Sequence, residues 1–271
     1  MSGDRFWFDL TLWTNDPDVA RRADRAGVDR IGLDLESIGK HDRQRNLGTW
    51  ISPHREDQLP AIRAVLSRAS LFVRCNPAGP QSSDEIRRLI DAGVEIIMLP
   101  NFRSAREVLE VLRIVDGQAQ LVPLIERFEA TQCIDELLAI PAVEEFHLGL
   151  NDLSFDLKLD NRLALLAAPW IVTLAHRIRS AGRRLGVAGI GRAGDDSLPV
   201  PSDLIYASLA RLHATGSLVS RSFRVDELQT DDLAREIGST RARLAYWAAA
   251  DADSIEQARL ALLQAVKEPI Q

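Results

Sequence analysis

Eight short apolar runs, separated by segments with helical spacing, constrain the fold of this chain more than any other feature. The third to sixth runs recur about every 25 residues, the length of one strand–helix unit. Strict alternation indicates parallel strands, and eight units predict an α/β fold of the closed (β/α)8 TIM barrel type. An open doubly wound sheet is the alternative. The runs are FWFDLTL (6–12), VDRIGLDL (28–35), SLFVRCN (70–76), EIIMLP (95–100), QLVPLIE (120–126), EEFHLGL (144–150), RLGVAGI (184–190) and HATGSLVS (213–220).

The C-terminal part of the sequence contains more helical segments than a (β/α)8 barrel needs. We expect residues 1–221 to form the barrel core and residues 222–271 to hold two helical segments, where one would complete the eighth unit. The segment Ser254–Val266 carries apolar residues at Ile255, Ala258, Leu262 and Val266. A helix with such a stripe must bury it, so the sequence predicts an extra packed C-terminal helix.

The composition of the chain argues against several classes of function. A net charge of -6 and a pI near 5.5 argue against nucleic-acid and anionic-membrane partners. Cys75 and Cys133 are too few for a disulfide framework or a cysteine zinc site, and we expect a cytoplasmic protein. Of 33 basic residues only Lys40, Lys158 and Lys267 are lysines, and none lies in an apolar run. Imine chemistry and pyridoxal phosphate are therefore not expected, because both need a desolvated lysine amine.

Polar residues follow the predicted strands at their carboxyl ends, where barrels of this type build their sites. Two consecutive strands end in acids, Glu126 and Asp152, and neighbouring parallel strands lie roughly 4.8 Å apart. Oxygen-only ligands favour Mg²⁺ or Mn²⁺, with Co²⁺ as an alternative. The whole set is Asp34, Glu36, Arg74, Asn76, Asn101, Glu126, Asn151, Asp152, Arg192 and Arg221.

The remaining coordination positions suit a 2-oxo acid, whose carboxylate and keto oxygens chelate one ion. Arg74 closes an apolar strand and is predicted to stabilise an enolate oxygen, the alternative being an internal salt bridge. Glu36 is a second catalytic candidate. Leu150 and Asn151 are predicted to bind the substrate carboxylate through backbone N–H groups, and Arg192 to hold an anionic group.

Five pieces of the chain together resemble the HpcH/HpaI aldolase and citrate lyase family of the phosphoenolpyruvate/pyruvate barrel superfamily. They are LDLE (33–36), FVRCNP (72–77), AGVEIIMLP (92–100), LIER (124–127) and GLNDLS (149–154). The resemblance implies a metal-dependent, class II aldolase or carbon–carbon lyase that acts through pyruvate enolate, with an aldehyde as partner. It also implies Glu126 and Asp152 as metal ligands and Arg74 as the enolate-stabilising arginine. An acyl-CoA lyase and a non-catalytic scaffold remain alternatives.

The chain departs from the pattern of that family at the proton-transfer position. Pyruvate aldolases of this type usually carry histidine directly after the glutamate of the second strand, where this chain has Ser37. A serine hydroxyl is a poor base without an activating partner. His41 is therefore the candidate catalytic base, with His54 of the same loop as the alternative.

Gly189, Gly191 and Gly194 match a G-x-G-x-x-G pattern after a strand, but the following DDSLPVPSD does not open a helix there. A nicotinamide (NAD) site is therefore not expected. The family resembled often exchanges a C-terminal helix between subunits. That resemblance predicts a homo-oligomer in which residues 222–271 pack on a neighbouring subunit.

Overall fold

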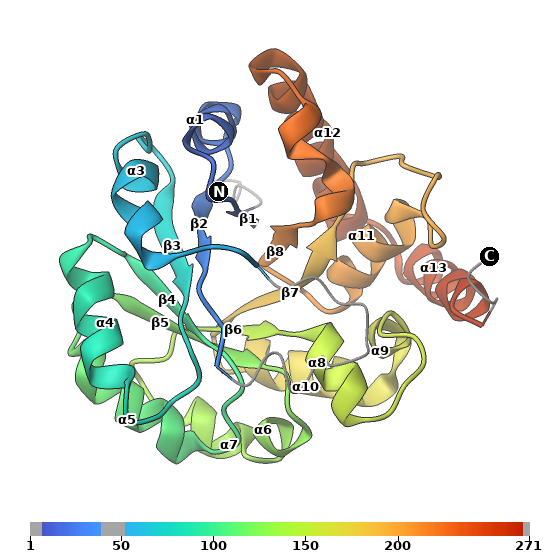
Figure 1. Cartoon of the computed structure of the whole chain (residues 1–271). Helices are drawn as coiled ribbons and strands as arrows, with labels where there is room; N and C mark the ends of the chain where they lie inside the picture. The colour runs from blue at the N-terminus through green and yellow to red at the C-terminus, as the bar shows by residue number, and fades with distance from the viewer. Residues whose placement is uncertain (1–6, 39–51, 268–271) are drawn as a thin grey trace, which may run out of the picture.

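In a computed structural model that describes residues 7–38 and 52–267, eight parallel strands close into a barrel (Figure 1). Each strand pairs with the next in the sequence, and β8 pairs with β1. This confirms the predicted (β/α)8 fold and excludes the open sheet. The strands are β1 (Asp9–Trp13), β2 (Arg30–Asp34), β3 (Ser70–Arg74), β4 (Ile96–Leu99), β5 (Gln120–Ile125), β6 (Glu145–Leu148), β7 (Arg184–Ile190) and β8 (Gly216–Val219).

Helices surround the barrel, and the apolar core lies between them and the strands (Figure 1). The α-helices are α1 (Pro17–Ala26), α3 (Leu59–Arg63), α4 (Ser82–Asp91), α5 (Ala105–Val115), α6 (Phe128–Gln132), α7 (Ile134–Leu138), α8 (Leu150–Asp156), α9 (Ala164–Ala167), α10 (Pro169–Ser180), α11 (Ser202–Arg211), α12 (Thr230–Ala248) and α13 (Ala252–Ala265). Short 3-10 turns are η1 (Glu56–Gln58), η2 (Arg221–Phe223) and η3 (Val225–Glu227). Among the described residues, no helix has the length and apolar character needed to cross a membrane.

The C-terminal segment supplies two helices, as the sequence predicts. Helix α12 fills the eighth helical position, between α1 and α11. Helix α13 is the surplus one, and it packs on α11 and α9 of its own chain. Ala258 and Leu262 of its apolar stripe are buried in that contact.

The barrel interior is layered along the strands. At the amino-terminal end Arg30 is buried and donates to both carboxylate oxygens of Glu145, at 2.6 and 2.8 Å, and to Asp9 at 2.7 Å. Arg184 adds contacts to the same two acids at 3.1 and 3.4 Å. Above this charged layer lies an apolar cluster of Phe72, Ile96, Met98, Val122 and Leu124. The cluster separates the charged floor from the polar strand ends above.

Strand β7 carries a bulge that the sequence does not reveal. Gly186 pairs with Gly216 and Gly189 with Leu218, so β7 holds one residue more than β8 in this stretch. Ala188 takes up the extra length with a φ of 57°. Beside it, the His147 ring occupies the space that a Cβ at Gly186 would need, because that Cβ would lie 2.1 Å from His147 Nδ1.

Candidate metal centre

Arg74 ends β3 at the carboxyl-terminal mouth of the barrel, and Asp34 at the end of β2 holds it in place. Its Nε and Nη2 donate to the two Asp34 carboxylate oxygens at 2.8 and 2.7 Å. Its Nη1 lies 3.4 Å from Glu36 Oε2. Burial opposes the charge of the guanidinium, but Asp34, Glu36 and Glu126 outweigh it and raise the pKa of Arg74. The internal salt bridge expected as an alternative role is therefore present, and it fixes the orientation of the third nitrogen.

Three carboxylates gather beside this arginine. One oxygen each of Glu36, Glu126 and Asp152 lies within 4.8 Å of the other two. The residues are only 3 %, 3 % and 8 % exposed. They come from the loop after β2, the end of β5 and helix α8. The predicted pair Glu126 and Asp152 is thus brought together, and Glu36 joins it as a third acid.

The cluster holds more negative charge than its surroundings neutralise. Burial, and then the charges of Glu36 and Asp152, raise the pKa of Glu126 to about 8. The charge of Arg74 and a hydrogen bond from Asn101 only partly offset this. A bound cation would offset the part of this shift that comes from the charges of Glu36 and Asp152.

Asn101 holds two of the three acids. It follows β4 with a φ of 58°, a left-handed conformation that asparagine tolerates better than most residues. Its backbone N–H donates to Glu126 Oε1 at 2.9 Å, and its Nδ2 donates to Glu36 Oε1 at 3.1 Å. Arg127 Nε donates to Asn101 Oδ1 at 2.6 Å and thereby fixes the amide orientation. The sequence marks Asn101 as a strand-end residue, but no spacing pattern predicts these contacts.

Gly149 leaves room for the side chain of Glu126. A Cβ at this position would lie 2.8 Å from Glu126 Cβ and 2.9 Å from Glu126 Oε2. Gly149 is also the residue before α8, so Leu150 and Asn151 are the first residues of that helix and Asp152 lies in its first turn. The N–H groups of a first helical turn have no partner within the helix, as the predicted substrate-binding role of Leu150 and Asn151 requires.

The other predicted site residues differ in how their contacts relate them to the acid cluster. Arg192 follows β7, and its Nε donates to the Phe223 carbonyl at 2.8 Å and not to an acid of the cluster. His54 Nδ1 accepts a hydrogen bond from the Asp34 N–H at 3.0 Å. His41 lies outside the described residues. Ser37, at the position of the missing histidine, contacts Asn76 Oδ1 through its N–H and its hydroxyl.

The residues present fit a divalent cation of the oxygen-preferring type. Around Mg²⁺, oxygen ligands at about 2.1 Å lie roughly 3 Å from their nearest neighbours, so the three carboxylate oxygens, now within 4.8 Å of one another, would move closer together to share one ion. No histidine or cysteine belongs to the cluster among the described residues. This donor set favours Mg²⁺ or Mn²⁺ over zinc.

The fold and the position of the acid cluster define a barrel with its site at the carboxyl ends of the strands. The family model described as HpcH/HpaI aldolase/citrate lyase matches residues 10–192, and the chain belongs to this family. Among solved structures, the HpcH/HpaI aldolase from Desulfitobacterium hafniense DCB-2 is similar in fold, with a TM-score of 0.56 and 19% sequence identity. The similarity covers 79% of this chain and 86% of that one. None of the curated proteins compared with the chain matches it significantly. Family membership implies an enzyme of the lyase type that acts on small molecules.

Proposed function

We propose that the chain is a divalent-metal-dependent aldolase-type lyase that acts on a 2-oxo acid, such as pyruvate, and an aldehyde. The observation that carries the proposal is the buried cluster of Glu36, Glu126 and Asp152 facing Nη1 of Arg74. Glu126 and Asp152 would hold Mg²⁺ or Mn²⁺, with Glu36 as a further oxygen ligand or as the acid that orients Arg74. The ion would supply polarisation of the keto group of the substrate.

Arg74 would stabilise the negative oxygen that develops when the 2-oxo acid loses a proton. Asp34 occupies two of its nitrogens, so only Nη1 is directed toward the acid cluster. A donor fixed in this way needs no reorganisation during the reaction. The first-turn N–H groups of α8, at Leu150 and Asn151, would bind the substrate carboxylate, and Arg192 would serve an anionic group of the aldehyde partner.

We assign proton abstraction to His41. His54 is less suited, because its Nδ1 accepts from the Asp34 N–H and the proton of the neutral ring must then lie on Nε2. His54 therefore offers no free lone pair to a substrate proton in this arrangement. His41→Ala should abolish exchange of the pyruvate methyl protons with solvent deuterium, and His54→Ala should largely retain it. The opposite pattern would transfer the base assignment to His54.

The test of the metal site compares Glu126→Gln and Asp152→Asn with Glu110→Gln, an exposed acid paired with Arg106 on α5. Calorimetry with Mn²⁺ should show binding to the parent chain and to Glu110→Gln, and none to the two site variants. Pyruvate proton exchange with added Mg²⁺ should follow the same pattern. Undiminished Mn²⁺ binding in both site variants would refute the metal site, and a parent chain that binds metal without proton exchange would indicate a scaffold.

A further inference from the structure

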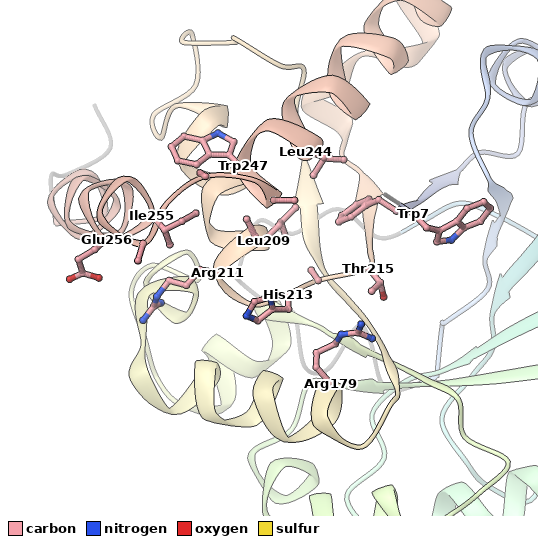
Figure 2. Close-up of a pocket in the computed structure, with 16 residues that line it drawn as sticks. Trp7, Arg179, Leu209, Arg211, His213, Thr215, Leu244, Trp247, Ile255 and Glu256 are labelled. Atoms are coloured by element: carbon pink, nitrogen blue, oxygen red, sulfur yellow. The ribbon is translucent and has the colours of Figure 1, made fainter. Parts of the chain in front are cut away.

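A cavity lies at the opposite end of the barrel from the acid cluster. It has a volume of about 590 Å³ and opens between the last four α-helices and the segments that lead into β1 and β8 (Figure 2). That volume is within the range of small-molecule sites, roughly 300–1,000 Å³. The cavity shares no lining residue with the acid cluster.

Two arginines line this cavity without a carboxylate partner among the described residues. Arg179 of α10 uses Nη1 to donate to the Arg183 carbonyl, and its Nε is shielded from solvent, which leaves the Nη atoms to reach a ligand in the cavity. Arg211 of α11 uses Nη1 to donate to the Leu166 carbonyl at 3.2 Å. A guanidinium has five N–H donors, so each of these side chains keeps N–H groups on its Nη atoms for which the described residues supply no acceptor.

The charge of the cavity wall is positive. Among the described residues that line it, the only acid is Glu256, and both of its carboxylate oxygens accept from Arg259. Burial, and then the charge of Arg259, lower the pKa of Arg211, and the charge of Glu256 only partly offsets them. His213 lies between the two arginines in the view of Figure 2.

The other side of the cavity is apolar. Leu244 and Trp247 of α12, Leu209 of α11 and Ile255 of α13 line it. In Figure 2 the tryptophan and leucine of α12 lie on one side, and Arg179, Arg211 and His213 on the other. Trp7, before β1, is 64% exposed and also lines the cavity.

We propose that this cavity binds an amphipathic carboxylate, with its apolar body against α12 and α13 and its anionic group on Arg179 and Arg211. The guanidinium fork matches a carboxylate in geometry and charge. Such a ligand would bridge the barrel helices α10 and α11 to the C-terminal helices. Binding would therefore stabilise the docking of residues 230–265 on the barrel.

The test titrates the full-length chain with decanoate and follows the fluorescence of Trp7 and Trp247, which both line the cavity. Binding should saturate at one decanoate per chain. Decyltrimethylammonium has the same tail and the opposite charge, and should bind at least about tenfold more weakly. Excess pyruvate with Mg²⁺ should leave decanoate binding unchanged, because the two sites are separate.

Variants locate the binding site. Arg179→Gln and Arg211→Gln should each weaken decanoate binding at least about tenfold, whereas Arg106→Gln, at an exposed pair on α5, should not. Ala210→Leu extends a side chain from α11 into the cavity without removing a charge, and should also weaken binding, which covers the case in which an arginine variant does not fold. No saturable binding, equal affinity for the two decyl ligands, or displacement by pyruvate with Mg²⁺ would each overturn the proposal.

Discussion

Asn101 shows how one residue organises the acids of the site. It joins Glu126, Glu36 and Arg127 through its backbone N–H, its amide nitrogen and its amide oxygen. Its left-handed φ of 58° is what directs the backbone and the side chain toward different acids. Two substitutions separate these contributions.

Asn101→Gly should keep the backbone conformation and the N–H contact to Glu126, but lose the amide. We expect about tenfold weaker Mn²⁺ binding, the usual scale for one hydrogen bond to a charged group, with stability changed by less than about 1 kcal/mol. Asn101→Ala loses the amide too, and it retains a Cβ that costs about 1 kcal/mol at this φ relative to Asn101→Gly. Calorimetry and urea denaturation measure the two quantities, and equal Mn²⁺ affinity of Asn101→Gly and the parent chain would contradict the role of the amide.

The buried ring of His147 should make the folding stability of the chain depend on pH. Burial lowers its pKa from 6.5 to about 4, although the charge of Glu145 and a hydrogen bond to the backbone of Ala188 act in the other direction. In the unfolded chain the ring takes up its proton near pH 6.5. Because the unfolded state then binds more protons, the contribution of His147 to folding stability should be lost between about pH 6.5 and 4, up to a few kcal/mol.

Urea denaturation at several pH values measures this effect. The parent chain should lose stability more steeply over that window than His147→Gln, which cannot take up the proton. Parallel curves for the two proteins would show that His147 does not titrate differently in the folded and unfolded states.

At this scale the sequence predicts the positions of the charged groups but not their contacts. Glu126, Asp152 and Arg74 are recognisable because each ends or follows an apolar run, and strand ends converge in a barrel. The two-nitrogen contact between Arg74 and Asp34 depends on rotamers and on the register of β2 and β3. Arg127, which directly follows Glu126 in the sequence, is the residue that fixes the amide of Asn101.

At the scale of elements, two glycines inside regular secondary structure should respond to alanine substitution with opposite changes in stability. Gly186 lies in β7, where an added Cβ would be 2.1 Å from His147 Nδ1. Gly238 lies inside α12 with nothing within 4 Å of an added Cβ. Gly186→Ala should therefore destabilise by at least about 2 kcal/mol, and Gly238→Ala should stabilise by up to about 1 kcal/mol.

Urea denaturation of both variants checks the sign of each effect. A stable Gly186→Ala protein would mean that the His147 ring can leave its place beside the bulge. The sequence predicts the bounds of β7 but not this bulge, because its extra residue, Ala188, is not one of the types that favour a positive φ.

At the scale of the whole molecule, the contact of α13 with the barrel bears on assembly. Ala258 and Leu262 are buried against helices of the same chain, while Leu260 of α13 is 53% exposed. A helix joined through the short turn after α12 can make the same contacts with a second copy, and such exchange yields closed oligomers. We therefore keep the prediction of a homo-oligomer whose assembly depends on residues 250–271.

Light scattering of the full-length chain and of a chain truncated after Ala250 tests this prediction. The full-length chain should have at least the mass of a dimer at micromolar concentration, and the truncated chain a smaller mass. A monomeric full-length chain would exclude helix exchange whatever the truncation does.

The apolar layer of Phe72, Met98 and Leu124 lies between the charged floor of the barrel and the acid cluster. Solvent therefore reaches the acid cluster through the mouth of the barrel. For the proposed reaction, the aldehyde and the protons of solvent would enter by that same route. A nucleophilic carbon formed at the site could then either attack the aldehyde, which forms a carbon–carbon bond, or take up a proton from solvent. The outcome would depend on which of the two reaches the carbon first. The loops around the mouth, and not the strands, would therefore determine the yield of the carbon–carbon bond. These loops are the part of the barrel to vary when a different electrophile is wanted.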